Sequence, residues 1–225
     1  MKRRLFTLAF LVGPVMVASQ TQPKPAVPPS GHSTPLAPKL AVDAPLYRNT
    51  TFAFRFKIPY GWVDRTKEMR EQDGPKKADA TDSEANEKPV KGKAPAQGDL
   101  LLAVFERPPD AIGETVNSAV VIASESAAAY PGLKKAEDYL GPLDELTTSK
   151  GFKADGDPSV VEIDARQLVR VDFNKPLTGK LTMRQSTLIL LAKGHIISFT
   201  FIGGSEDEVD NLIEGLHFDA AKPQH

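Results

Sequence analysis

The foldable part of the chain begins with an alternation of aromatic and polar residues. Phe52, Phe54 and Phe56 alternate with small or charged residues, and Pro59 follows them. This period of two predicts a strand with one aromatic face that ends at the proline. Continuous apolar runs are typical of strands that are buried on both faces. Such runs lie at 100–105 and 118–124.

The second half of the chain is the richest in strand patterns. In one predicted strand Val169 and Val171 point to one side, while Arg170 and Asp172 point to the other. Short turns at 164–166 and 193–194 indicate hairpins. The first of these turns has no glycine, although a glycine would suit it better. The predicted strands are 160–163, 167–173, 180–192 and 195–202.

A first helix is predicted at 133–146, where leucines and an alanine recur at helical spacing. Because Pro142 removes one helical hydrogen bond, we expect a kink or break near Gly141. Gly151 is placed to end the helix.

A second helix is predicted at 205–216, starting with a capping box. Ser205 accepts a hydrogen bond from the third backbone amide while Glu208 reaches back to the cap. Its apolar stripe ends at Leu216. The order of elements predicts an α+β fold, a mostly antiparallel β-sheet flanked by helices.

The N-terminus has the pattern of a secretory signal peptide over 1–19. Three basic residues precede a 14-residue apolar run, and small residues lead to a cleavage site near Ser19. The run is too short for the ~20 residues that span a bilayer. We therefore expect an exported protein with no membrane span after cleavage, and a change of net charge from -1 to -4.

Two segments lack the apolar residues that a packed core needs. A proline-rich linker is predicted over 20–45, and a charged, disordered insertion over 64–98 with a transient helix around 67–72. What remains is a single domain over 46–219, followed by a tail over 220–225.

Composition excludes several kinds of chemistry. The chain has no cysteine, which excludes disulfides, thiolate metal sites and cysteine nucleophiles. A net charge of -1 gives no basic field for nucleic acid. His195 and His217 have no second ligand at metal spacing, so we expect no metal and no cofactor. The sequence Asp155-Gly156-Asp157 fits a turn better than a calcium loop.

A row of polar residues on the predicted strands is the best candidate for a binding face. If they align on one side of the sheet, they form a partner-binding face together with Trp62, whose indole combines an apolar ring with a polar N–H group. The alternative is a solvated face with cross-strand pairs such as Asp172–Arg184, and a Trp62 that plugs the core. The strand residues are Arg170, Asp172, Thr182, Arg184, Ser186, Ser198 and Thr200.

The start of the domain resembles the opening signature of the PsbP/Mog1-like families, in which a strand of alternating aromatics runs into a proline and a tryptophan. The residues that carry the resemblance are Tyr47, Asn49, Phe52, Phe54, Phe56, Pro59, Gly61 and Trp62. The later order of elements is similar as well. The resemblance implies an α/β/α sandwich around an antiparallel sheet, a scaffold for binding macromolecules, and no enzymatic activity.

From these observations we expect an exported, non-enzymatic interaction module with a protein partner in the envelope or outside the cell. Two alternatives stay open, a carboxylate-based hydrolase and a carrier of a small apolar ligand. The sequence names neither the partner nor the oligomeric state.

Overall fold

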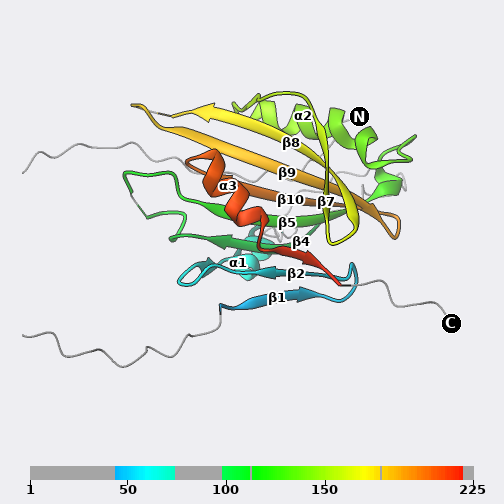
Figure 1. The fold of residues 1–225 in the computed structure, drawn as a ribbon, viewed down its shortest axis with the longest axis horizontal. Helices are drawn as coiled ribbons and strands as arrows, with labels where there is room; N and C mark the ends of the chain where they lie inside the picture. The colour runs from blue at the N-terminus through cyan, green and yellow to red at the C-terminus, as the bar shows by residue number, and fades with distance from the viewer. Residues whose placement is uncertain (1–43, 74–97, 112, 178, 220–225) are drawn as a thin grey trace, which may run out of the picture.

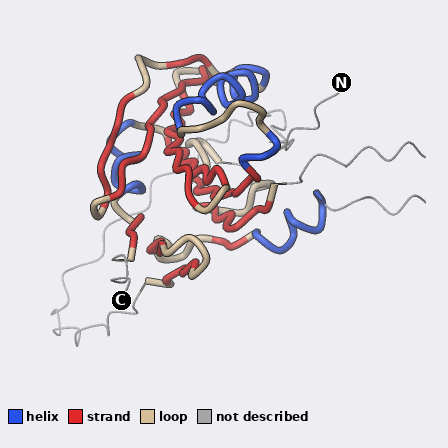
Figure 2. Tube along the Cα trace, turned by 90° about the vertical axis from the view of Figure 1, so that its right-hand side faces the viewer, coloured by secondary structure: helices blue, strands red, loops and turns tan. Residues whose placement is uncertain are grey.

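The computed structural model describes residues 44–73, 98–111, 113–177 and 179–219. The predicted signal peptide, most of the predicted linker and the predicted tail lie outside these residues. Within them, all paired strands are antiparallel and form two sheets. Helices lie on both sides of the strands (Figure 1; Figure 2). The predicted α+β class is confirmed.

The larger sheet has the strand order β3-β4-β5-β10-β9-β8-β6, and β7 also pairs with β8. Its strands are β3 (Val63–Asp64), β4 (Asp99–Phe105), β5 (Ala119–Ser126), β6 (Lys153–Ala154), β7 (Ser159–Ile163), β8 (Arg166–Pro176), β9 (Thr182–Ala192) and β10 (His195–Gly203).

The smaller sheet has the order β1-β2-β11. It consists of β1 (Leu46–Asn49), β2 (Phe54–Lys57) and β11 (Leu216–Phe218). The α-helices are α1 (Thr66–Asp73), α2 (Leu140–Ser149) and α3 (Glu206–Ile213), and short 3₁₀ helices lie at Ala127–Ala129 and Ala136–Tyr139.

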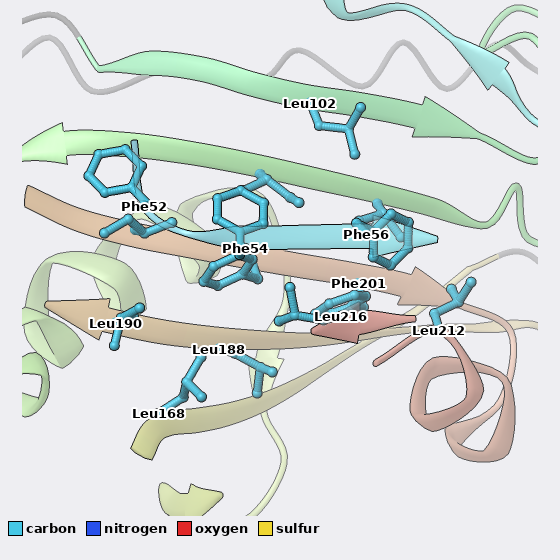
Figure 3. Packing of buried hydrophobic residues seen from close by; sticks show 14 of the residues in the cluster. Phe52, Phe54, Phe56, Leu102, Leu168, Leu188, Leu190, Phe201, Leu212 and Leu216 are labelled. Carbon is cyan, nitrogen blue, oxygen red and sulfur yellow. The ribbon is translucent and has the colours of Figure 1, made fainter. Parts of the chain in front are cut away.

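The main core lies between the two sheets (Figure 3). Phe54 and Phe56 of β2 are fully buried against Phe199 and Phe201 of β10, with ring centroids 5.1 and 6.1 Å apart. Val209 and Leu212 of α3 and Leu216 of β11 belong to the same cluster. This face of the large sheet is therefore covered by the small sheet and α3 together.

The opposite face of the large sheet is covered by helices. Leu143 of α2 and Tyr139 pack on β8 and β9, and Met69 of α1 packs on a cluster of β4 and β5 residues. The sandwich expected from the resemblance thus has helices on one face, but a three-stranded sheet and one helix on the other.

Part of the predicted disordered insertion is folded. Residues 64–73 form the end of β3 and helix α1, whereas 74–97 lie outside the described residues. The Thr66 hydroxyl accepts from the amide of Ala103 at 2.9 Å, and the Arg70 side chain donates to the carbonyl of Leu100 at 2.6 Å. These bonds to β4, with the contact of Met69, hold a segment that is poor in apolar residues.

The predicted first helix is shorter than expected and starts later. The segment 133–135 is not helical, a 3₁₀ turn follows, and α2 begins at Leu140. Pro142 causes no break, because it is the third residue of α2, where a backbone amide has no partner within the helix. Gly151 follows the helix with φ +85°, as expected for a glycine that ends one.

The predicted last helix is too long at its C-terminal end. It ends at Ile213, and Leu216 starts strand β11, opposite Phe56 of β2. The predicted cap is confirmed, since the Ser205 hydroxyl accepts from the amide of Glu208 at 3.2 Å. The Glu208 carboxylate accepts instead from the amide of Gly204 at 2.8 Å and from the buried Ser118 hydroxyl.

Candidate functional site

A shallow groove of about 260 Å³ lies between β8, β9 and the start of α3. Its lining is mostly charged or polar. The lining residues are Asp155, Arg170, Asp172, Phe173, Arg184, Gln185, Ser186, Glu206 and Val209. Four of the predicted face residues, Arg170, Asp172, Arg184 and Ser186, are therefore brought together here.

Arg170 is the centre of this groove. Its Nε lies 3.0 Å from both carboxylate oxygens of Asp172, one Nη lies 2.8 Å from Asp210 of α3, and the other donates to the Ser186 hydroxyl at 3.1 Å. The Ser186 hydroxyl donates in turn to Asp172. One guanidinium thus ties two strands of the sheet to the helix above them.

The surroundings of Arg170 keep its guanidinium charged. Burial by itself lowers the pKa of Arg170, but the hydrogen bonds and charges of Asp172 and Asp210 outweigh burial and raise the pKa above its usual range. The Arg170 side chain retains only 20% of its exposure, compared with 50% for Asp210. The network is therefore a charged framework in which Arg170 is largely buried, while Asp210 on α3 remains half exposed to solvent.

The predicted cross-strand pair of Asp172 with Arg184 is wrong. Arg184 lies opposite Asn174 and binds Asp155, with 3.0 Å between Nη1 and Oδ2. Asp172 lies opposite Ser186 and is taken by Arg170, its neighbour two residues before it on the same strand. Residues two apart on a strand share a face, which explains this choice.

The prediction that Ser198 and Thr200 share this face is wrong. The two-residue turn at Lys193-Gly194 sets a register in which Ser198 lies opposite Ile189 and Thr200 opposite Thr187. Directly opposed residues share a face, so both point toward the helical side of the sheet, and Thr200 lies 3.2 Å from the Thr187 hydroxyl. A shift of one residue moves a whole strand pattern to the other face.

Trp62 lies away from the groove, after a turn beyond β2. Its side chain is half-buried against the main core, and its backbone amide donates to the carbonyl of Pro59 at 3.3 Å. The intervening Gly61 has φ +83°, and Tyr60 beside it is 76% exposed. The exposed aromatic residue of this turn is therefore Tyr60, not Trp62. Thr182 is the first residue of β9, opposite Pro176.

Sequence reasoning missed the acidic residues that complete the groove. Asp155 follows β6, and its backbone amide donates to the carbonyl of Asp172 at 2.8 Å. Glu206 and Asp210 lie four residues apart on α3, a spacing that places both on one side of a helix. The spacing could be read from the sequence. The position of this side of α3 next to Arg170 of β8 could not be predicted from it.

A second polar cluster lies on the helical side of the sheet. The hydroxyls of Tyr130 and Tyr139 both donate to the carboxylate of Glu125, from Tyr139 at 2.8 Å. Burial, followed by the negative charge of Glu125, raises the pKa of Tyr139 far above its usual range. Because Tyr139 is buried and its hydroxyl is already bonded, this cluster ties the helical layer to β5.

Each of the two histidines of the domain has one polar contact through its Nδ1 atom. His195 Nδ1 lies 3.0 Å from the carbonyl of Lys193, and His217 Nδ1 lies 3.2 Å from Asp164. Across the described residues, no group of three or more histidine, aspartate or glutamate side chains is arranged to hold a metal ion. In the same part of the chain, no helix is both long and apolar enough to cross a membrane.

No model of a protein family and no curated protein sequence matches the chain. Similar solved structures include a cyanobacterial PsbP from Synechocystis sp. PCC 6803, with 14% identity, a TM-score of 0.44, and coverage of 81% of this chain and 97% of that one. A protein of unknown function from Pseudomonas aeruginosa has 13% identity, a TM-score of 0.36, and coverage of 76% and 88%.

A third similar structure is LpqN, which is involved in cell envelope biogenesis of Mycobacterium tuberculosis. It has 11% identity, a TM-score of 0.31, and coverage of 59% of this chain and 90% of that one. The first of these structures bears the name PsbP, the family whose opening signature the start of the domain resembles. At identities of 11–14% and TM-scores of 0.31–0.44, no family, activity or partner follows from these similarities.

Proposed function

We propose that this chain is an exported, non-enzymatic binding module that contacts another envelope or secreted macromolecule through the groove between β8, β9 and α3. The observation that carries the proposal is the preformed framework around Arg170, which holds charged groups of β8 and α3 and a hydroxyl of β9 at the edge of an open groove. Such pre-organisation lowers the entropic cost of binding. Export is supported by the signal-peptide pattern over 1–19.

The lining of the groove does not favour nucleophilic catalysis. Ser186 is the hydroxyl residue that lines it, and this residue is only 2% exposed. Its hydroxyl already donates to Asp172 and accepts from Arg170. A serine nucleophile needs a free hydroxyl beside a general base, so these contacts favour a structural role for Ser186.

The charge of the groove indicates the chemistry of the partner. The lining carboxylates are Asp155, Asp172 and Glu206, and Asp210 binds Arg170 from above. Against these four acids stand two guanidinium groups, those of Arg170 and Arg184. The excess of negative charge favours a partner segment that carries lysine or arginine.

The two alternatives have weaker support. A carboxylate hydrolase needs two convergent carboxylates with open oxygens. Both oxygens of Asp172 lie against Arg170 and Asp155 binds Arg184, so Glu206 is the one lining carboxylate among the described residues that no arginine binds. A carrier of an apolar ligand needs an apolar cavity, but fully buried aromatic rings such as Phe54 and Phe199 fill the space between the sheets.

The proposal is tested by site-specific photocrosslinking in the organism of origin. A photoreactive amino acid replaces Glu206, an exposed residue that lines the groove, in the full exported chain. The matched control replaces Glu137, which is also an exposed acidic residue and lies on the helical side of the sheet. We expect a discrete crosslinked product from position 206 that position 137 does not give.

A second arm uses Glu206→Lys together with a photoreactive residue in place of Arg184, a half-buried residue that lines the groove. Because Glu206→Lys reduces the negative excess, we expect the crosslinked product to decrease. Identical products from positions 206 and 137 would exclude the groove as the contact surface. A product that persists undiminished in the Glu206→Lys chain would exclude a basic partner segment.

A further inference from the structure

The outer face of the small sheet is a second surface with its own chemistry, away from the groove. In β2 the buried Phe54 and Phe56 point inward to the core, so Arg55 and Lys57 point outward. Arg48 of β1 lies directly opposite Arg55, and His217 of β11 lies opposite Arg55 on its other side. Two arginines and a histidine thus form one row across all three strands.

Two aspartates hold this row together. Asp219 lies 2.6 Å from Arg55 and 3.5 Å from Arg48, and Asp164 lies 3.2 Å from His217. Like charges directly opposite each other destabilise a sheet, which explains why Asp219 bridges the arginines. Even so, Arg48 remains 53% exposed, and Lys57 is exposed beside it.

Exposed apolar side chains accompany the basic residues. Leu46, opposite Lys57 on the same outer face, is 51% exposed. Tyr60, in the turn that follows β2, is 76% exposed. The amide of Ile58 donates to the carbonyl of Pro45 at 2.8 Å, so the start of β1 and the Tyr60 turn lie at the same end of the sheet. Basic residues beside an exposed tyrosine and leucine suit the interface between lipid headgroups and acyl chains.

We propose that the outer face of the small sheet docks the protein on an anionic lipid bilayer. Arg48 and Lys57 bind phosphate groups of the lipids, while Leu46 and Tyr60 enter the headgroup layer. The charge of the face supports this occupant. Arg48, 53% exposed, and the exposed Lys57 both lie beside Leu46 on the outer face, so cationic and apolar groups meet at one surface.

The docking face and the groove are separate surfaces, so one can act without the other. Arg48 and Lys57 lie on the three-stranded sheet, whereas the groove lies on β8, β9 and α3 (Figure 1). A protein docked through the small sheet can keep the groove open for its partner. The inference therefore stands or falls independently of the proposed function.

The test is co-sedimentation of the full exported chain with vesicles of phosphatidylglycerol and phosphatidylcholine at a ratio of about one to two, at low salt. The variant combines Arg48→Gln with Lys57→Gln. The matched control combines Lys153→Gln with Lys180→Gln, two exposed lysines outside the small sheet. A basic side chain near an anionic bilayer strengthens binding about fivefold, so we expect roughly 25-fold weaker partition for the variant and little change for the control.

The chains in this comparison differ only at the substituted residues, so a difference between the variant and the control reports on the small sheet. Equal partition of the two chains would overturn the proposal. If the double variant loses its native circular dichroism, Lys57→Gln alone is used, with an expected loss of about fivefold. Binding that persists undiminished on vesicles of phosphatidylcholine alone would also overturn it.

A polyglutamate column distinguishes the bilayer from an acidic protein. Retention on the column, without preference for the anionic vesicles, would overturn the bilayer in favour of an acidic polypeptide. Tyr60→Ser separates the two further. We expect it to weaken binding to the vesicles and leave retention on the column unchanged, because only the bilayer accepts the exposed ring.

Discussion

At the scale of single residues, Arg170 shows how a charged side chain becomes part of the fold. It is bound by Asp172 on its own strand, by Ser186 on the next strand and by Asp210 on α3. The buried Ser186 hydroxyl depends on Arg170 and Asp172 for its hydrogen bonds. Removal of the guanidinium leaves several polar groups with fewer partners, which costs more than the loss of one ion pair.

We therefore predict that Arg170→Ala lowers the free energy of unfolding by about 2 kcal/mol. Arg184→Ala provides the comparison, because Arg184 makes a more exposed pair with Asp155, with side chains 37% and 42% exposed. Such a pair contributes less than about 1 kcal/mol. Urea unfolding of both variants measures the difference. Equal losses would show that Arg170 acts as an ordinary surface ion pair.

Asp164 makes stability depend on pH through a contact between the turn that joins β7 to β8 and strand β11. The backbone amide of Phe218 donates to its carboxylate at 3.0 Å and His217 lies 3.2 Å away, and these contacts lower the pKa of Asp164 below its usual value of 3.8. A depressed pKa in the folded state gives stability that is present above the unfolded value and lost as pH falls through the folded value.

We predict that Asp164→Asn loses stability at neutral pH and flattens the decline in acid. Asparagine tolerates the left-handed backbone at this position, where φ is +46°, and its side-chain oxygen can still accept from Phe218. The substitution therefore isolates the charge. The thermal midpoints of both chains, measured from about pH 5 to about pH 2, should converge as the pH falls. A constant gap between them would contradict a role for the carboxylate charge.

At the scale of elements, the local sequence pattern was sufficient to predict most strands, but it was insufficient to predict where elements end and how they connect. The hairpin of β9 and β10 was predictable, because its two-residue turn and its alternation agree. Leu216 was misplaced, since at helical spacing it extends the stripe of α3, and only its pairing with Phe56 makes it part of a strand. Helix α1 was underestimated for the same reason, because its partners lie on β4, some 30 residues along the chain.

The joint between α3 and β11 depends on a glycine. A Cβ atom at Gly215 would lie 2.9 Å from the Phe56 ring and 3.1 Å from the carbonyl of Lys57. Since the second neighbour is backbone, the contact cannot be relieved by a side-chain movement. Gly204, on the other side of α3, is the matched control, because a Cβ atom there would have ordinary contacts of 3.5 Å or more.

We predict that Gly215→Ala lowers the free energy of unfolding by about 1–3 kcal/mol, and that Gly204→Ala changes it by less than about 1 kcal/mol. Urea midpoints of the two variants give the comparison. A Gly215→Ala chain as stable as the unmodified protein would mean that the small sheet can move away from α3 without loss of packing.

At the scale of the whole molecule, the large sheet carries different layers on its two faces. The small sheet and α3 cover one face, and α1, α2 and the 3₁₀ turn cover the other. This arrangement explains why the predicted polar face was only half correct. Alternation assigned Arg170 and Asp172 to one face, but the face of Ser198 and Thr200 depended on a register that pairs them with Ile189 and Thr187.

The small sheet with α3 and the helical layer pack on opposite faces of the same strands, so we expect the two layers to unfold together. Leu143 of α2 is 5% exposed on the helical face, and Leu143→Ala should cost about 2–4 kcal/mol. Trp62, the one tryptophan of the chain, packs against the core on the opposite face and reports on the small sheet.

In a cooperative domain, Leu143→Ala shifts the urea midpoint of Trp62 fluorescence as far as that of the helical circular dichroism signal. Phe54→Ala, in the small sheet, should shift both signals by an equivalent of about 3–5 kcal/mol. A Trp62 transition that stays in place while the helical signal moves would divide the molecule into two folding units. Coincident transitions would mean that the small sheet and the groove belong to one cooperative folding unit, as expected from the strands β8, β9 and β10 that lie between the layers.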